Sequence, residues 1–373
     1  MMWERVKLAD VSDSCLGKML DQRKNKGIYK PYLANVNVRW GAFDLDNLQE
    51  MKFEDDEDER YGIKYGDLII CEGGEPGRCA IWKEQLPNMK IQKALHRLRV
   101  NEEMDYRYVY YWFLLAGKQG ALKQYYTGAT IMHMPGQKLK EVVIDKPPLD
   151  VQRKIGDYLE AFDDLIENNQ KQIKLLEEAA QRLYKEWFVD LRFPGYEDVD
   201  VVDGVPEGWT YKRVEEFGEV ITGKTPSTSK TEYYGGSIPF VTIPDMHGNV
   251  FPLVTEKTLT KVGADTQKNK YLPANTVIVS CIATVGLVNI AIEPCQTNQQ
   301  INSVILHDDN NLYFFYESMK RIKTLLDGVG SNGATMTNVN KTKFSNIKVL
   351  YPTEDLVMKY NEFCKPIFAQ ILA

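Results

Sequence analysis

Hydrophobic positions follow a heptad period in one long stretch of the chain, from Val151 to about Asp190. The stretch contains no proline, and its single glycine, Gly156, falls early. Apolar residues recur every seven positions, and a second series follows four positions after the first, which is the a/d pattern of a coiled coil. These positions form the helix seam: Ile155, Leu159, Phe162, Ile166, Asn169, Ile173, Leu176, Ala180, Leu183 and Trp187. The pattern predicts a coiled-coil helix about 60 Å long rather than an ordinary amphipathic surface helix.

Outside this stretch, short apolar runs alternate with turn residues. Residues 1–147 and 206–352 hold β-branched and aromatic runs separated by glycine, proline and asparagine. The expected strands are Val36–Val38, Leu68–Cys71, Thr276–Ser280 and Asn302–Leu306. The expected helices are Tyr106–Ala116 and Leu312–Leu326. This pattern is too irregular for a sandwich and has too few βα alternations for a doubly wound sheet. Each segment is therefore predicted to be an α+β globule.

The two globules are predicted to be copies of one fold, because several markers recur in the same order at nearly one offset. Trp3 and Gly17-Lys18 recur 206 positions later as Trp209 and Gly223-Lys224. Gly128-Ala129-Thr130 and Pro147 recur 205 positions later, as Gly333-Ala334-Thr335 and Pro352. The predicted organisation is a globule at 1–147, a helix at 148–190, a linker at 191–205, a globule at 206–352 and a second helix at 353–373.

Charge is distributed unevenly over these parts. The chain has a formal net charge of −6, which would argue against a partner that carries phosphates if the charge were spread evenly. Residues 1–147 hold 23 bases and 22 acids, residues 206–352 hold 14 and 13, and residues 148–205 hold 7 and 14. The acidity therefore belongs to the helix and linker, and neither globule is acidic. Nucleic acid is not excluded, although phosphate attraction alone is expected to give weak binding.

Composition excludes several other classes. No run of about 18 apolar residues exists, so we expect no membrane span, and the start of the chain has no secretory pattern. The six cysteines include no CxxC pair and the four histidines are scattered, so we expect no metal site and reduced, packed thiols. These features predict a cytoplasmic protein.

One motif of nucleotide-binding proteins is present, at Gly218–Thr225, which matches GxxxxGK[ST]. A phosphate-binding loop needs a buried strand before it and a helix after it. Here a charged segment precedes the motif, Pro226 follows it at once, and the matching place in the first globule lacks the hydroxyl residue. The acidic run Glu54–Glu59 is expected to be a solvated loop rather than a cation site. The chain is therefore predicted to be non-catalytic, and a nucleotide-binding enzyme that uses Gly223-Lys224-Thr225 is the alternative.

Side chains suited to DNA gather at matching places in the two globules but differ in identity. Lysine and arginine suit phosphates and guanine edges, asparagine suits adenine edges, and hydroxyl groups serve either purpose. The candidates in the first globule are Lys18, Arg23, Lys24, Lys26, Lys30, Tyr32, Asn35, Asn37 and Arg39. Those in the second are Lys224, Thr225, Ser227, Thr228, Ser229, Lys230, Tyr233, Tyr234 and Thr242. A scaffold whose globules contact only proteins is the other alternative.

With these motifs the chain resembles the specificity (S) subunits of type I restriction–modification systems. The resemblance covers essentially the whole chain. It is carried by the Trp-led start of each repeat, ITGKTPS at 221–227, GDLIICEGGEPGRCAI at 66–81, the GAT elements, PPLDVQRKI at 147–155, and LYKEWFVD with RFPG at 183–195.

The resemblance implies two target-recognition domains in a head-to-tail repeat, each followed by a long helix, with the two helices packed as an antiparallel coiled coil that spaces the half-sites. It also implies that the chain reads a bipartite double-stranded DNA target with one half-site per domain. The implied partners are two modification (methyltransferase) subunits and restriction (translocase/nuclease) subunits. S-adenosylmethionine, ATP and Mg are then expected on those partner subunits, and no cofactor is expected in this chain.

The second helix departs from that family pattern. Tyr360, Ile367 and Ile371 repeat the seam 205 positions after Ile155, Phe162 and Ile166, but Ala373 corresponds to Asn168. The helix is thus either natively short or truncated, and residues 169–190 are expected to lack part of their partner. The polar seam position, Asn169, is expected to fix the register of the helix pair, at some cost in stability.

Overall fold

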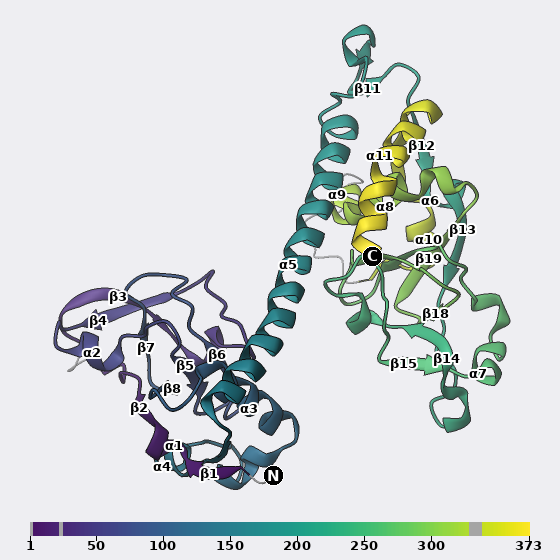
Figure 1. Ribbon diagram of the computed structural model, residues 1–373. Helices are drawn as coiled ribbons and strands as arrows, with labels where there is room; N and C mark the ends of the chain where they lie inside the picture. The colour runs from purple at the N-terminus through teal and green to yellow at the C-terminus, as the bar shows by residue number, and fades with distance from the viewer. Residues whose placement is uncertain (1–2, 22–24, 328–337) are drawn as a thin grey trace. The chain divides into compact units, whose positions relative to one another are not determined.

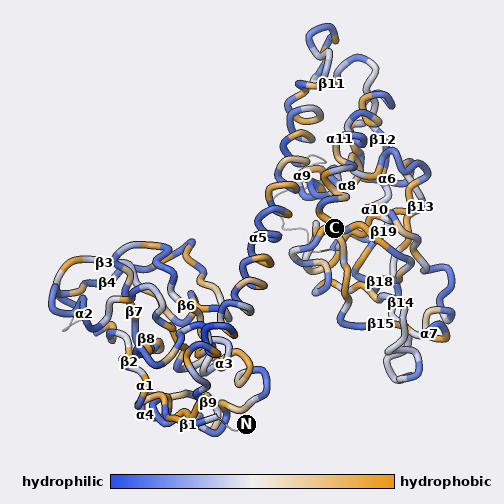
Figure 2. Tube along the Cα trace, viewed as in Figure 1, coloured by the Kyte–Doolittle hydropathy of each residue, from blue (hydrophilic) through white to orange (hydrophobic). Residues whose placement is uncertain are grey.

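The computed structural model describes residues 3–21, 25–327 and 338–373 (Figure 1). The chain divides into two compact units, unit 1 (Met1–Asn168) and unit 2 (Asn169–Ala373). The 40-residue helix α5 (Leu149–Phe188) gives its first half to unit 1 and its second half to unit 2. Figure 2 shows hydrophobic positions recurring along α5, as the heptad pattern predicts.

Unit 1 is an α+β globule with three small sheets. A four-stranded sheet has the order β2-β8-β5-β6, a three-stranded sheet has the order β4-β3-β7, and β1 pairs with β9. The strands are β1 (Glu4–Lys7), β2 (Ser12–Leu16), β3 (Ile28–Leu33), β4 (Gln49–Phe53), β5 (Leu68–Cys71), β6 (Cys79–Ile81), β7 (Lys90–Ile91), β8 (Leu95–Val100) and β9 (Val143–Lys146). The helices are α1 (Leu8–Val11), α2 (Glu57–Tyr61), α3 (Tyr106–Lys118), α4 (Gly136–Glu141) and the 3₁₀ turns η1 (Asn35–Asn37) and η2 (Ala121–Tyr125).

Unit 2 repeats this arrangement. Its sheets have the orders β13-β19-β16-β17, β15-β14-β18 and β12-β20, with a separate β10-β11 hairpin. The strands are β10 (Val201–Val202), β11 (Val205–Pro206), β12 (Thr210–Arg213), β13 (Gly218–Thr222), β14 (Tyr234–Val241), β15 (Lys257–Leu259), β16 (Val277–Ser280), β17 (Val288–Ile290), β18 (Gln296–Thr297), β19 (Ile301–Leu306) and β20 (Lys348–Tyr351). The α-helices are α6 (Val214–Phe217), α7 (Lys261–Asp265), α8 (Leu312–Lys320), α9 (Ile322–Asp327), α10 (Lys341–Ser345) and α11 (Glu354–Leu372). The 3₁₀ turns are η3 (Tyr196–Asp198), η4 (Thr231–Tyr233), η5 (Ile243–Met246), η6 (Lys268–Lys270) and η7 (Asp309–Asn311).

The predicted internal repeat is confirmed by strand order and strand direction. In both units the three-stranded sheet contains one parallel pair, β3 with β7 and β14 with β18, and the four-stranded sheets are antiparallel throughout. The GAT element at 128–130 lies among the described residues, whereas its counterpart at 333–335 lies outside them.

Most of the predicted elements are present, and two differ. The segment Val36–Val38 is not a strand, because Asn37 accepts a hydrogen bond from the Ala34 amide (2.9 Å) and donates one to Asp44 O (3.0 Å), which folds the chain into η1. The single helix expected at Leu312–Leu326 is two helices, α8 and α9. They are interrupted at Arg321, whose amide bonds Ser318 O at 3.1 Å.

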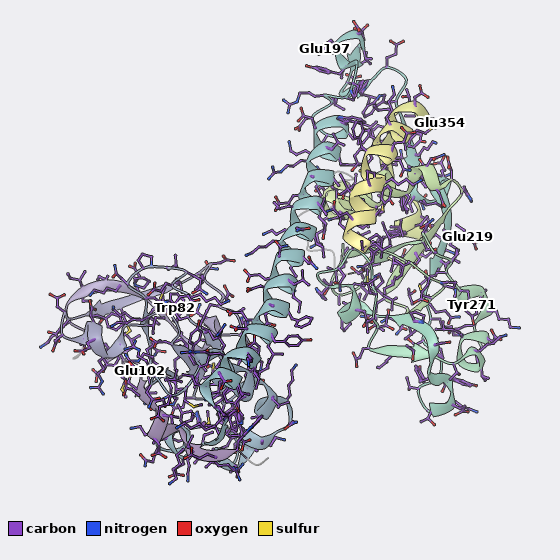
Figure 3. The ribbon with its side chains drawn as sticks, in the orientation of Figure 1. Trp82, Glu102, Glu197, Glu219, Tyr271 and Glu354 are labelled. Atoms are coloured by element: carbon purple, nitrogen blue, oxygen red, sulfur yellow. The ribbon has the colours of Figure 1, made fainter. Side chains whose placement is uncertain are left out.

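Each unit has its own hydrophobic core, formed between the inner strands and the helix that follows them. Val109 and Phe113 on α3 are fully buried over the sheet of unit 1, and Phe314 and Phe315 on α8 are buried at the same place in unit 2. Trp82, labelled in Figure 3, is one of the largest buried side chains of unit 1. The six cysteines are free thiols, and five of them are buried.

The helix seam is packed in one half and open in the other. In unit 2, Ile173, Leu176, Ala180, Leu183 and Trp187 pack into the core that includes α8 and α11. Tyr360 of α11 donates a hydrogen bond to Ala180 O at 3.0 Å, and Trp187 contacts the ring of Phe363. Residues 161–168, at the end of unit 1, are by contrast all exposed, and they include the seam positions Phe162 and Ile166. Asn169, the first residue of unit 2, is exposed as well.

The expectation that residues 169–190 lack part of their partner is therefore met only at the start of this segment, where Asn169 is exposed, and is wrong for residues 173–188, which are packed. Within unit 2, α11 runs opposite to the second half of α5 (Figure 1). In an antiparallel pair the beginning of one helix faces the end of the other, so a short α11 covers residues 173–188 and leaves the earlier seam positions open. Asn169 is exposed rather than buried, so it fixes no register within this chain.

Candidate nucleic-acid interface

The Gly-Lys pair follows the edge strand of the four-stranded sheet in each unit. A Cβ on Gly17 would lie 2.4 Å from Gln92 O, and one on Gly223 would lie 2.2 Å from Asn298 O. The next amide bonds the neighbouring segment in both units, from Lys18 N to Ile91 O (3.0 Å) and from Lys224 N to Thr297 O (2.9 Å). The close approach of two backbone segments requires the glycine in each unit.

The surroundings of Gly223-Lys224-Thr225 do not form a phosphate-binding loop. The preceding strand, β13, pairs antiparallel with β19, and the residues that follow run as a loop as far as the 3₁₀ turn η4. A phosphate loop requires a helix whose N-terminus faces the phosphates. The GxxxxGK[ST] match is therefore explained by strand geometry, and the nucleotide-binding alternative has no support in the fold.

Three segments of unit 2 meet beside Lys224. The side chain of Gln267 donates to Lys224 O at 2.6 Å and to Gln296 Oε1 at 2.7 Å. Thr260 N donates to Tyr233 O at 2.9 Å, which seats the start of α7 against the loop of residues 224–233. Thr225 donates its hydroxyl hydrogen to Gln299 Oε1 at 2.7 Å, which adds the turn between β18 and β19.

The exposed side chains of these segments are basic or carry hydroxyl and amide groups. We define the lysine face of unit 2 as Lys224, Ser227, Thr228, Ser229, Lys230, Lys261, Lys268 and Gln299, all of which are exposed. Lysines suit phosphate oxygens, and hydroxyl and amide groups suit base edges or phosphates. Of this face, the sequence-based candidates included Lys224, Lys230 and the three hydroxyl residues between them.

The other candidates of unit 2 are half-buried and support the loop. Tyr234 donates to Pro226 O at 2.7 Å, and Tyr233 lies under the Lys230 ammonium, 5.9 Å from its ring centre. Thr242 donates to Asp245 at 2.7 Å and begins η5, so its hydroxyl group is already engaged. These residues shape the lysine face rather than extend it.

Several candidates in unit 1 are wrong, because they are buried in structural contacts. Lys18 is 3% exposed, donates to Lys52 O at 2.9 Å and forms an ion pair with Glu57. Tyr32 is buried and donates to Gln49 Oε1 at 2.6 Å, and the buried Asn37 holds η1. Lys30 forms an ion pair with Asp58 at 2.7 Å.

The acidic run Glu54–Glu59 pairs with the two lysines among these candidates, Lys18 and Lys30, so it is not simply a solvated loop. Asp58 lies within 2.7 Å of the Lys30 ammonium and 3.1 Å of the buried Lys90 ammonium. Burial acts to raise the pKa of the Asp58 carboxyl, but the hydrogen bonds from Lys30 and Lys90 outweigh it and the pKa is lowered. The run therefore neutralises lysines that pack inside unit 1.

The remaining candidates of unit 1 are exposed, half-buried or outside the described residues. Lys26 and Arg39 are exposed, and Arg39 donates to Val36 O at 2.6 Å. Asn35 is half-buried, and Arg23 and Lys24 lie outside the described residues. The part of unit 1 that corresponds to the lysine face is a hollow of about 520 Å³. It is lined by Met19, Leu20, Glu72, Gln92, Lys93, Ala94, Thr127, His133 and Pro135.

Sequence reasoning missed Lys93, Lys261, Lys268 and Gln299. Lys93 and Gln299 occupy equivalent turns, because β8 and β19 begin 206 positions apart. The repeat offset could have identified this pair, since each follows its Gly-Lys marker by 75 positions. Lys261 and Lys268 reach the site only through the packing of α7 and η6, which no local pattern shows.

In the described part of the chain, no group of three His, Cys, Asp or Glu residues could hold a metal ion. Over the same residues, no helix is long and apolar enough to cross a membrane.

Comparison with known proteins places these features in a family. The family model of the type I restriction modification DNA specificity domain matches residues 2–178 and again residues 206–355. The type I restriction enzyme HindI specificity subunit of Haemophilus influenzae is 34% identical over 290 residues, which is 61% of this chain and 63% of that subunit. The MjaIX specificity subunit of Methanocaldococcus jannaschii is 27% identical over 319 residues, 82% of this chain and 72% of that subunit. The crystal structure of the S subunit from M. genitalium superposes with a TM-score of 0.62 at 14% identity, and it covers 99% of this chain and 90% of that one, so the fold is shared.

Proposed function

The chain belongs to the family of type I restriction–modification DNA specificity subunits, and from this premise we propose that it reads a bipartite DNA target, one half-site per unit. One observation carries the proposal. The two units share strand order and the Gly-Lys turn, yet the exposed and half-buried side chains around that turn differ. Lys93 and Met19 in unit 1 correspond to Gln299 and Thr225 in unit 2. A duplicated scaffold with different polar contacts at one place is suited to reading two different base sequences.

In this proposal the chain supplies recognition, and its partners supply the chemistry. Modification subunits with S-adenosylmethionine methylate an adenine, which must leave the duplex to reach their active site. Restriction subunits hydrolyse ATP and cleave the DNA. The globules of this chain, residues 1–147 and 206–352, are close to electrically neutral, so tight binding is expected only when those subunits add their own contacts. This division of roles accounts for a chain without a nucleotide loop.

Sequencing of methylated adenines in cells that express the chain with its modification partner tests the proposal. The expected result is a two-part motif whose second half changes, and whose first half stays, when Gln299 and Ser227 are both replaced by alanine. The matched control is Thr210→Ala with Asn310→Ala, which removes an exposed hydroxyl and an exposed amide outside the lysine face. If methylation never depends on this chain, it is a scaffold rather than a reader of DNA.

A further inference from the structure

Large apolar side chains are exposed on two separate segments around the hollow of unit 1. Met19 and Leu20 line the hollow on one segment, and Ile131 and Met132 lie in the loop 127–133, whose two end residues line it as well. These four side chains are between 46% and 66% exposed. Exposure of several large apolar side chains around one concave surface marks a place that another molecule covers.

Backbone contacts hold the wall of the hollow in place. The amide of Met134 donates to Glu72 O at 2.7 Å, and Thr127 and His133 exchange backbone hydrogen bonds of 2.8 and 2.9 Å. Gly73 lets the loop approach, because a Cβ there would lie 2.9 Å from His133 Nδ1. The hollow is therefore formed before any molecule binds in it.

Unit 2 has the same backbone arrangement at this place but a different side chain. The amide of Glu72 donates to Ala94 O, and that of Cys281 donates to Gln300 O, both at 2.9 Å. Cys281 therefore corresponds to Glu72, since each directly follows an inner strand of its sheet, β16 or β5. Glu72 is half-buried at the hollow, whereas Cys281 is buried. An acidic residue thus lines the hollow of unit 1 where unit 2 has a buried thiol.

The apolar pair of Met19 and Leu20 also differs from its counterpart in unit 2, which lies 206 positions later. Thr225 stands in place of Met19 and donates its hydroxyl hydrogen to Gln299 Oε1 at 2.7 Å. Pro226 stands in place of Leu20 and is buried. The side chains that follow the Gly-Lys turn are therefore exposed and apolar in unit 1, whereas in unit 2 they are polar or buried.

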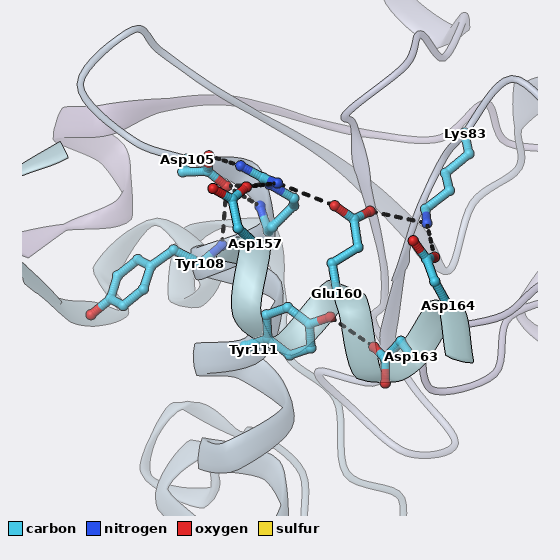
Figure 4. Close-up of polar contacts among 9 residues, drawn as sticks. Lys83, Asp105, Tyr108, Tyr111, Asp157, Glu160, Asp163 and Asp164 are labelled. Carbon is cyan, nitrogen blue, oxygen red and sulfur yellow. Dashed lines mark hydrogen bonds and ion pairs between the residues drawn. The ribbon is translucent and has the colours of Figure 1, made fainter. Parts of the chain in front are cut away.

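Another polar surface of unit 1, where α3 meets the first half of α5, is unsuited to DNA. Its charged residues are Lys83, Asp105, Arg107, Asp157, Glu160, Asp163 and Asp164 (Figure 4). Arg107 pairs with three of the carboxylates, Lys83 pairs with two, and Asp163 accepts a hydrogen bond from Tyr111 at 2.8 Å. Because five carboxylates surround two cations, this surface repels phosphates. The hollow is thus the better candidate for the reading surface of unit 1.

The side chains of the hollow suit base edges rather than phosphates. Glu72 would repel a phosphate, whereas a glutamate can accept a hydrogen bond from the amino group of cytosine. Met19 and Leu20 suit the C5 methyl group of thymine, the apolar group that a base pair presents in the major groove. A concave surface with both kinds of side chain is therefore complementary to base edges in that groove.

We infer, on the basis of the proposed function, that the hollow of unit 1 reads a thymine through its methyl group, and that Met19 and Leu20 select it. Unit 2 uses hydroxyl, amide and ammonium groups at the equivalent place. The duplicated fold thus reads its two half-sites with two kinds of contact, apolar in unit 1 and polar in unit 2.

The test replaces thymidine by deoxyuridine, which lacks only the methyl group. The half-site of unit 1 is the half of the methylated motif that stays when Gln299 and Ser227 are both replaced by alanine. Labelled duplexes carry deoxyuridine at one position at a time, and fluorescence anisotropy measures their affinity for the chain in complex with its modification partner. We expect one position in the half-site of unit 1 to lose about fourfold or more in affinity, as removal of one buried methyl group implies.

A double variant shows which side chains contact the methyl group. In a chain with Met19→Ala and Leu20→Ala, the affinities for the thymidine and deoxyuridine duplexes should become equal, because the contact that distinguishes them is gone. Both side chains are about half exposed, so their loss leaves the core of unit 1 intact, and a thermal melt confirms this.

The matched control is Ile28→Ala, which removes a side chain that is 64% exposed at the start of β3. The other end of β3 approaches the hollow, where Leu33 O accepts a hydrogen bond from the amide of Gln92 at 3.0 Å. Ile28→Ala should therefore keep the preference for thymidine.

The inference is overturned if the half-site of unit 1 contains no A·T pair, if no deoxyuridine position weakens binding, or if the double variant keeps the preference. It is also overturned if the double variant no longer joins its modification partner in gel filtration, because the hollow would then bind a protein. If methylation does not depend on this chain at all, the proposed function fails. A two-part motif that depends on the chain but ignores the methyl group overturns this inference alone.

Discussion

In the Gly-Lys pair that marks both repeats, the glycine has the same structural role in the two units, whereas the lysine has a different one in each. The glycine has the same structural task in both units, since an added Cβ would lie only 2.4 Å (Gly17) or 2.2 Å (Gly223) from a backbone oxygen of the neighbouring segment. The lysine differs, because Lys18 is buried in an ion pair whereas Lys224 is exposed. A motif shared between repeats therefore indicates a shared fold at this point, and not a shared contact with a ligand.

Replacing either glycine by alanine should destabilise its unit. The added Cβ in Gly223→Ala would lie 2.2 Å from a backbone oxygen, which cannot move without breaking the strand contacts, so we expect a loss of about 1–3 kcal/mol in the free energy of unfolding. Urea unfolding measures the effect, and the exposed Ser229→Ala serves as the control. Unchanged stability in Gly223→Ala would mean that the close approach is not needed.

Glu317 is a buried carboxyl group whose ionisation should set a pH dependence for unit 2. It is 2% exposed, and its Oε1 has no partner among the described residues. Burial raises the pKa of Glu317 from its ordinary value of 4.5 to about 7, Lys320 opposes the rise, and Glu177 adds to it. The folded state thus holds a proton that the unfolded state releases, so stability is full below about pH 4.5 and is lost as the pH rises to 7.

The variant Glu317→Gln removes this ionisation. Between pH 5 and pH 8 its stability should rise relative to the unchanged protein, by up to roughly 3 kcal/mol. Urea unfolding at several pH values, with hydrogen exchange of the α8 amides, measures the change. Glu219, which is exposed and labelled in Figure 3, provides the control Glu219→Gln. Parallel pH curves for Glu317→Gln and the unchanged protein would contradict the role of this carboxyl.

At the scale of single residues, the sequence predicted which segments hold polar side chains but not which of these side chains are free. Lys18 meets Glu57, which is 39 positions away, and Lys30 meets Asp58, 28 positions away. The acidic run and the basic run look like two separate solvated patches until β3 and β4 bring them together. Ion pairs between residues that a sheet brings together leave no signal in any short stretch of the sequence.

At the scale of elements, long periodic patterns were predictable and partners were not. The heptad pattern predicted both ends of α5 to within two residues, because an apolar seam sustained over five heptads is compatible with few structures other than a long helix. The direction in which α11 runs decides which half of the seam packs against it. The expected strand at Val36–Val38 failed for the opposite reason, since three residues carry too little pattern to outweigh the side-chain bonds of Asn37.

Two aromatic residues of α11 separate the packed face of this helix from its open face. Tyr360 is fully buried and contacts both Tyr184 and Phe188, whereas Phe363 touches Trp187 and is 59% exposed. Tyr360→Ala should therefore cost about 3–5 kcal/mol of unfolding free energy, as loss of a large buried ring does. Phe363→Ala should cost less than about 1 kcal/mol. Similar losses in the two variants would show that α11 does not pack on α5 through the Tyr360 face.

For the whole molecule, duplication was the most predictable feature, because markers spaced over 200 positions constrain each other in a way that single motifs do not. The distribution of charge was also predictable, once the net charge was counted separately for each segment. The lysine face was only half predictable, since α7 and η6 join it through the contacts of Gln267 and Thr260. The sequence therefore identified the part of the lysine face that lies in the loop after β13, and missed the part that α7 and η6 contribute through tertiary packing.

Under the proposed function, α5 sets the distance between the two half-sites, and the length of its exposed middle can be changed without disturbing either core. Residues 161–170 are exposed along their whole length. Duplicating residues 162–168 adds one heptad, which keeps the seam in phase to within about 20° and lengthens the helix by about 10 Å. The methylated motif should then gain about three base pairs of spacer, because the duplex rises about 3.4 Å per base pair.

The matched control inserts seven Gly and Ser residues at the Asp203-Gly204 turn of the β10-β11 hairpin. That turn follows the part of α5 that is already packed into unit 2, so a longer turn should leave the spacer unchanged. Sequencing of methylated adenines reads the spacer in both variants. If the heptad variant methylates the original motif, or if the hairpin variant changes the spacer as much, then α5 does not set the distance between the half-sites.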